Sequence, residues 1–167
     1  TLFGTLPRDL AALPVVIKPR CGQWGQDTEV LDASPSEAVR AKLSMGTHFA
    51  QRLGPGQTEF ATHILMHRGE VRFCKTIEYD MGADRLVKGK SHVPVAHRWR
   101  DEAPVQPELL RMLRALGFGD GICCIDYRIV DGKPQVFEIN PRFGGSLAGR
   151  VGDFLDEYLA CVITETV

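Results

Sequence analysis

The sequence predicts an α+β fold, and two observations lead to that prediction. Two pairs of segments alternate apolar and polar residues, as antiparallel hairpins do, and three stretches have helical periodicity. The chain of 167 residues is long enough for one domain, or for one domain made of two small lobes. With 44% hydrophobic and 25% charged residues, its composition is that of a globular protein and excludes a disordered or fibrous one.

The first predicted elements are a strand, a loop and a second strand. Residues 13–18, Leu-Pro-Val-Val-Ile-Lys, are apolar and β-branched, which predicts a buried strand. A loop that contains Gly22 and Gly25 follows, and residues 29–31 return as a short strand.

A helix start follows this pair of strands. Ser34 is the expected N-cap, with Pro35 at the first helical position and Glu37 completing a capping box. We expect the helix to end near Gly46.

A possible lobe boundary lies just after the next strand. Residues 49–53 predict that strand, and Gly54-Pro-Gly56 ends it. The prediction is therefore a first lobe over 1–54 and a second lobe over 55–167.

The second lobe begins with a hairpin. Residues 59–66 and 71–78 alternate in polarity and are joined by a turn at Arg68-Gly69. The polar, aperiodic segment 81–103 is predicted to be a surface loop.

Two helices and one more hairpin complete the predicted fold. Residues 107–116 and 153–163 have an apolar face at helical spacing. Between them, residues 121–130 and 135–140 predict a hairpin that turns at Asp131-Gly132.

The charge balance excludes two classes of partner. The chain has 20 Lys+Arg against 21 Asp+Glu, a formal charge of −1, so we expect no nucleic-acid partner. No apolar run approaches the ~20 residues that span a bilayer, so we expect no membrane partner. Five cysteines without Cys-x-x-Cys spacing favour a reducing, cytoplasmic location.

The last hairpin carries the most informative side chains. Glu138 and Asn140 share a face, because side chains on a strand repeat every two residues. A three-residue loop over 131–133 places Asp126 directly opposite Glu138, whereas a two-residue Asp-Gly turn shifts the register and turns Asp126 to the other face. Both registers are open at this point.

Two carboxylates opposite each other repel, so a positive group is expected between them. Carboxylate and amide oxygens suit Mg²⁺ or Mn²⁺, and magnesium is commonly completed by substrate phosphates, which predicts a nucleotide partner. Arg142 can neutralise a phosphoryl group, and the backbone of Gly144-Gly145-Ser146 can approach an anion. The alternative is a solvated edge strand followed by a turn.

The segment Glu138-Ile-Asn-Pro-Arg142, preceded by Ile125-Asp-Tyr127, resembles the C-terminal signature of the ATP-grasp superfamily, which includes carbamoyl-phosphate synthase large chains. Upstream, Val15-Val-Ile-Lys18 with Gly22 and Gly25 is similar to the lysine strand and glycine loop of that superfamily. The resemblance implies the ATP-grasp fold, in which two α+β lobes with antiparallel sheets grip ATP.

The resemblance also implies roles for individual residues. It implies that the metal ligands are Asp126, Glu138 and Asn140, and that the groups that neutralise the phosphates in catalysis are Arg142 and Lys18. It implies that the residues that bind ATP are Lys18, Gly22, Gly25, Gln51, Leu53 and Glu59, with Glu59 on the ribose. Lys88 or Lys90 is a further candidate for a phosphate contact.

The activity implied by the resemblance is that of an ATP-dependent carboxylate-amine (or related) ligase that uses MgATP and an acyl phosphate. Its partners would be a small carboxylate and a nucleophile. The resemblance also implies an N-terminal domain of the same polypeptide, since such a domain usually completes the acceptor site in the superfamily. One alternative is an inactive ATP-binding or nucleotide-sensing module. Another is an α+β interaction module without nucleotide.

Overall fold

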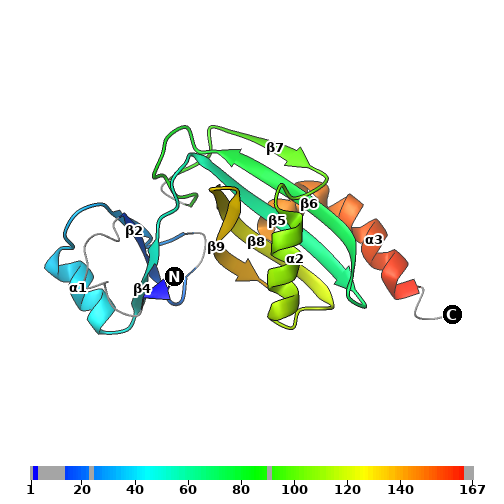
Figure 1. Ribbon diagram of the computed structural model, residues 1–167, viewed down its shortest axis with the longest axis horizontal. Helices are drawn as coiled ribbons and strands as arrows, with labels where there is room; N and C mark the ends of the chain where they lie inside the picture. Colours follow the sequence, from blue (N-terminus) through cyan, green and yellow to red (C-terminus); the bar gives the residue numbers. More distant parts are fainter. Residues whose placement is uncertain (1, 4–13, 23–24, 90–91, 164–167) are drawn as a thin grey trace. The chain divides into compact units, whose positions relative to one another are not determined.

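The chain forms two compact units in the computed structural model, which describes residues 2–3, 14–22, 25–89 and 92–163 (Figure 1). The first unit comprises Thr1–Gln57 with Met81–Ala96, and the second comprises Thr58–Asp80 with His97–Val167. Residues 81–96, which the sequence assigned to the second lobe, therefore group with the first unit. The functional division into lobes stays a prediction.

The first unit is a four-stranded sheet with one helix. Its strands follow the order β1-β4-β2-β3, and each pairing is antiparallel. The elements are β1 (Leu2–Phe3), β2 (Val15–Pro19), β3 (Glu29–Leu31), α1 (Glu37–Ser44) and β4 (His48–Arg52). Val39 and Leu43 of α1 pack on Val15, Ile17 and Ala50, so α1 covers one face of this sheet.

The predicted strands and helix of this unit are confirmed, but the helix begins later than expected. Its N-cap is Ser36, whose Oγ accepts a hydrogen bond from the Val39 N–H at 3.4 Å. Ser34 precedes the cap, and Pro35 is buried in the extended segment between them. Pro35 and Glu37, expected inside the first turn of a helix capped by Ser34, therefore stand one residue before and one residue after the actual cap. Leu13, the first residue of the predicted strand, lies outside the described residues.

The second unit is a five-stranded sheet with helices on both faces (Figure 1). Its strand order is β7-β6-β5-β8-β9. The elements are β5 (Thr58–His67), β6 (Glu70–Asp80), β7 (Ala96–Arg100), α2 (Gln106–Ala115), β8 (Gly121–Val130), β9 (Lys133–Asn140), the 3-10 helix η2 (Gly145–Arg150) and α3 (Val151–Ile163). Both predicted hairpins and both predicted helices are confirmed.

Neighbouring residues of the central strand β5 point to opposite sides of the sheet. Ile64 belongs to the core under α2, where Leu109 and Leu113 are almost completely buried. Leu65 belongs to the core under η2 and α3, with Phe154. The two faces are called here the α2 face and the α3 face.

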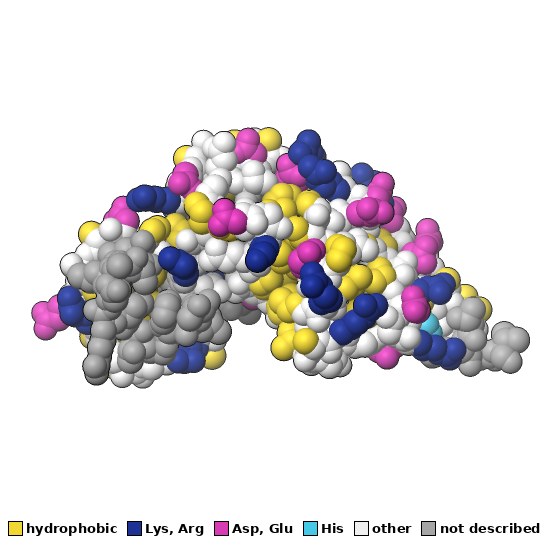
Figure 2. Space-filling view, viewed as in Figure 1, with side chains coloured by type: hydrophobic (Ala, Val, Ile, Leu, Met, Phe, Trp, Pro, Cys, Tyr) yellow, Lys and Arg dark blue, Asp and Glu magenta, His cyan; other side chains and the backbone are white. Residues whose placement is uncertain are grey.

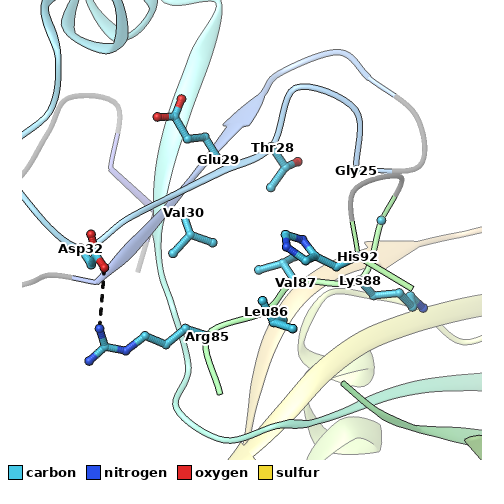
Figure 3. A pocket seen from close by; sticks show the side chains of 11 residues that line it. Gly25, Thr28, Glu29, Val30, Asp32, Arg85, Leu86, Val87, Lys88 and His92 are labelled. Carbon is cyan, nitrogen blue, oxygen red and sulfur yellow. Dashed lines mark ion pairs between the residues drawn. The ribbon is translucent and has the colours of Figure 1, made fainter. Parts of the chain in front are cut away.

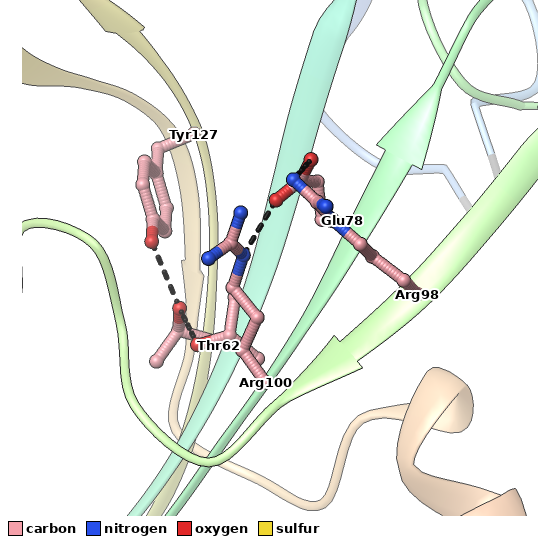
Figure 4. A network of polar contacts seen from close by, with 6 residues as sticks. Thr62, Glu78, Arg98, Arg100 and Tyr127 are labelled. Atoms are coloured by element: carbon pink, nitrogen blue, oxygen red, sulfur yellow. Dashed lines mark hydrogen bonds and ion pairs between the residues drawn. The ribbon is translucent and has the colours of Figure 1, made fainter.

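Strand β7 lies within the segment 81–103, so the predicted surface loop is wrong there. Its sequence, Ala-His-Arg-Trp-Arg, lacks apolar alternation because it is an exposed edge strand. Arg98 and Arg100 each donate a hydrogen bond of 2.6 Å to Glu78 of β6 (Figure 4). Burial alone would raise the pKa of Glu78, but the two guanidinium groups hold it below its ordinary value. The pairing of β7 is therefore accompanied by ion pairs to β6, which the local pattern of residues 96–100 does not reveal.

None of the described helices is long and apolar enough to span a membrane. On the face of the molecule seen in Figure 2, basic and acidic side chains are interspersed. The five cysteines are free, and burial raises the pKa of Cys123 to about 12, so that thiol stays protonated and packs as an apolar group.

Replacing Leu109, a fully buried residue of α2, tests the core of the second unit. We expect Leu109→Ala to lower the free energy of unfolding by about 2–5 kcal/mol, because it leaves a cavity in the α2 core. The matched control Leu116→Ala removes a side chain that is 66% exposed and should change stability by about 0.5 kcal/mol or less. Urea unfolding of the two variants measures the difference, and equal effects would contradict the described packing.

Candidate functional site

The turn between β8 and β9 has two residues. Val130 pairs with Lys133, and the turn residues Asp131 and Gly132 have φ of 52° and 72°. These left-handed values are typical of a tight hairpin turn. The three-residue loop considered in the sequence analysis is therefore wrong, and the two-residue turn alone would rotate Asp126 away from Glu138.

A β-bulge reverses that shift. Tyr127 pairs with Val136, but Asp126 pairs with Glu138, so Phe137 is an extra residue on β9. Beyond the bulge, Cys124 pairs with Asn140. The predicted juxtaposition of Asp126 and Glu138 is thus confirmed, although by a bulge instead of a longer turn.

The three predicted ligands lie together on the α3 face. Asp126 and Glu138 are direct cross-strand partners, and Asn140 follows Glu138 at the spacing that returns to the same side. Arg142 Nη2 donates to the Asn140 Oδ1 at 3.3 Å. An amide oxygen has two acceptor positions, so this hydrogen bond leaves one for a cation.

The oxygens of these residues fit a hard cation such as Mg²⁺. Among the described residues, no group of three or more His, Cys, Asp and Glu side chains is placed to hold a metal. The candidate set differs from such a group because its third donor is the Asn140 amide. The donor chemistry therefore suits magnesium and does not suit zinc.

The loop after β9 is packed against the sheet at Gly144. A Cβ on Gly144 would lie 2.5 Å from His63 Cε1 and 2.9 Å from Cys124 Sγ. Two residues later, Ser146 Oγ and His63 Nε2 form a hydrogen bond of 2.9 Å. Gly144 is thus required by the packing of this loop on β5 and β8, and not only by a possible anion.

His63 is a contact that the sequence analysis missed. It is fully buried, and it pairs with Cys124, which places it on the α3 face with the candidate ligands. Its spacing of two residues from Leu65 indicates that the two side chains share a buried face. No local sequence pattern predicts its contact with Ser146, which is 83 residues away.

Glu59 lies in a buried ion pair. Arg128 Nη2 donates to Glu59 Oε1 at 2.9 Å, and the two side chains are 0% and 6% exposed. Arg128 follows Asp126 by two residues, so it also belongs to the α3 face. In this structure Glu59 therefore neutralises a buried guanidinium, whereas the sequence predicted a ribose contact.

Two predicted ATP-binding residues meet in the first unit. Lys18 on β2 donates from Nζ to Gln51 Oε1 on β4 at 2.9 Å. Since Val16 pairs with Gln51, both side chains lie on the face of the sheet opposite α1. Leu53, which follows β4, is buried, and its N–H donates to the Pro14 carbonyl.

Gly25, residues 28–30 with Asp32, residues 85–89 and His92 line a cavity of about 420 Å³ (Figure 3). Its polar lining comes from Thr28, Glu29, Asp32, Arg85, Lys88 and His92. Arg85 Nη1 lies 3.9 Å from Asp32 Oδ2.

Gly25 contributes to this cavity through its backbone. It has φ of 66°, and a Cβ there would lie 3.1 Å from the Gly89 Cα. A larger residue at this position would therefore be strained and would push on the opposite wall. Gly22 is exposed, and Lys90 lies outside the described residues.

Comparison with known proteins shows similarity in structure. No family model and no curated protein matches the chain. A D-alanine–D-alanine ligase from Bacillus anthracis is similar with a TM-score of 0.57 and 15% identity, over 91% of this chain and 54% of that one. The ATP-grasp ligase PsnB, in a complex with a phosphomimetic variant of its minimal precursor, Mg and ADP, has a TM-score of 0.56 and 18% identity, over 90% and 47%.

An N5-carboxyaminoimidazole ribonucleotide synthetase from Thermotoga maritima is also similar, with a TM-score of 0.52 and 19% identity, over 91% of this chain and 39% of that one. The chain thus spans between 39% and 54% of the length of these three proteins. At such low identity the likeness shows the fold.

Replacing Glu59 separates its structural role from the predicted ribose contact. We expect Glu59→Ala to lower the free energy of unfolding by about 3–5 kcal/mol, because it leaves the Arg128 charge buried without this carboxylate. The double variant Glu59→Leu, Arg128→Met removes both charges and should recover most of that loss. Urea unfolding measures stability, and an unchanged midpoint for Glu59→Ala with weaker ATP binding would favour the ribose role instead.

Proposed function

The chain has the ATP-grasp fold, and from this premise we propose that it is the nucleotide-binding part of an ATP-dependent ligase that joins a carboxylate to an amine or a related nucleophile. The substrates are a small carboxylate, a nucleophile and MgATP, and the intermediate is an acyl phosphate. The similar proteins are longer, so the proposal includes further chain that completes the acceptor site.

The observation that carries the proposal is the convergence of Asp126, Glu138 and Asn140 on one face, with Arg142 bonded to Asn140. Two carboxylates in direct cross-strand contact destabilise a sheet unless a positive group lies near them. A divalent cation that carries a triphosphate supplies that charge. We assign Asp126, Glu138 and Asn140 as the ligands of Mg²⁺ or Mn²⁺.

Within the first unit, Lys18 and Gln51 are the proposed contacts of the nucleotide. A lysine ammonium that is already oriented by an amide oxygen is ready to bind a phosphate with little loss of side-chain entropy. Gly22 and Gly25 allow the loop backbone to approach an anion, and Leu53 provides an apolar contact for the adenine. Lys88 is a candidate for a further phosphate contact because it lines the cavity beside Gly25.

The proposed first step is attack of a substrate carboxylate oxygen on the γ-phosphorus, with cleavage of the bond to ADP. The nucleophile then attacks the acyl carbon, and phosphate leaves. When bound, the cation supplies neutralisation of the phosphate charge. The work of the protein is positioning and electrostatics. Arg142 and Lys18 neutralise charge on the phosphates, while the glycine loop excludes water.

Removing single ligands tests this assignment through binding, independently of the acceptor site. We expect Glu138→Ala and Asn140→Ala to weaken the Mg²⁺-dependent binding of ATP about tenfold or more, because each removes an oxygen ligand. In thermal unfolding, saturating MgATP at about 100 times Kd should stabilise the wild-type chain by about 2.7 kcal/mol, and the variants less.

The matched control is Glu157→Ala, which removes an exposed carboxylate on α3. It should keep the full MgATP shift. A full shift in both Glu138→Ala and Asn140→Ala would remove the metal assignment. MgATP binding without ADP release from the full-length protein, given carboxylate substrates, would favour the inactive nucleotide-binding alternative.

A further inference from the structure

We propose that the β-bulge at Phe137 positions Glu138 and Asn140 for the divalent cation, so that Phe137 and the residues that hold it are positioning residues of the site. This inference rests on the proposed function, because it concerns the same cation. Its basis is the hairpin register, which changes between the pairs Tyr127–Val136 and Asp126–Glu138.

The bulge is not needed to keep apolar residues in the core. Without Phe137, a two-residue turn would still pair Tyr127 with Val136 and Asp126 with Glu138, and the alternation of the strand would be intact. A regular hairpin would therefore bury the same side chains. The extra residue leaves one position without a ladder partner and bends and twists the strand at this point.

The bulge also stands beside an arrangement that is unfavourable in a sheet. Asp126 and Glu138 are the first pair beyond it, and like charges directly opposite each other repel. The bulge and the pair of like charges are both unfavourable, and they lie next to each other in the hairpin. Both are explained if the bend at the bulge sets the direction of the ligand oxygens. Bulges that re-aim side chains are common beside active sites.

Residues of three strands hold the bulge in place. The Arg128 guanidinium lies 5.9 Å from the centre of the Phe137 ring, within cation–π range. Glu59 on β5 binds that guanidinium at 2.9 Å, and the pair is buried. The extra residue of β9 is thereby packed on a buried arginine of β8 whose charge is met from β5.

Deleting Phe137 tests the inference with a variant that keeps every other pairing. Mn²⁺ is titrated into the protein in the presence of ADP, and bound Mn²⁺ is read from the loss of the free-ion electron paramagnetic resonance signal, against a titration of ADP alone. We expect the deletion to weaken protein-dependent Mn²⁺ binding by about 10- to 100-fold, the range found for groups that orient metal ligands.

Phe137→Ala separates the ring from the extra residue, because it removes the ring with its Arg128 contact and keeps the bulge. It should weaken Mn²⁺ binding, but clearly less than the deletion does. Phe137→Gly is a second variant that keeps chain length and frees the bulge backbone. It should weaken binding more than Phe137→Ala does, because glycine orders at greater entropic cost.

Three outcomes overturn the inference. Wild-type Mn²⁺ affinity in the folded deletion variant would show that the bulge does not position the ligands. A loss in Phe137→Ala as large as that in the deletion variant would assign the effect to the ring instead of the extra residue. Absence of protein-dependent Mn²⁺ binding in the wild type, with Glu138→Ala identical to it, would instead reject the proposed metal site and this inference with it.

Discussion

The register of the hairpin between β8 and β9 is the constraint on which the candidate site depends. Side chains on a strand alternate between faces, so a slip of one residue exchanges the whole set. Ile125 and Ile139 pair and belong to the core with α2, while their neighbours Asp126 and Glu138 lie on the α3 face. The register therefore fixes both which side chains enter the core and which converge at the candidate site. In this hairpin the register results from a tight turn followed by a bulge.

Along the α3 face, the central strand β5 changes from polar to apolar. Glu59 binds a buried arginine, Ala61 pairs with Asp126, and His63 bonds Ser146. Leu65 lies in the core under η2 and α3. The end of this face at Leu65 is thus packed with apolar side chains. Toward Glu59 the face carries polar side chains that bond one another. Such partnering is what makes buried polar groups tolerable.

Local patterns predicted most of the fold because its elements obey local rules. The turns at Arg68-Gly69 and Asp131-Gly132 have the left-handed backbone that their sequences favour. Helix α1 ends just before Gly46, which also has a left-handed φ. Strand β7 escaped prediction because it is an exposed edge strand whose arginines bond Glu78, on another strand. The N-cap of α1 is Ser36 instead of Ser34, although the spacing of Ser34 to Glu37 fits a capping box. The failure at β7 has its cause in contacts that are distant in sequence.

By itself, the sequence determined the hairpins, the helices and the residue types at the candidate metal site, since these follow from periodicity, turn chemistry and the oxygen donors at Asp126, Glu138 and Asn140. Only the tertiary structure decided that Asp126 faces Glu138, because the turn alone leads to the opposite register and the extra residue Phe137 corrects it. It also decided that Glu59 binds Arg128, a partner 69 residues away. Pairing across strands depends on packing in three dimensions, which no local window contains.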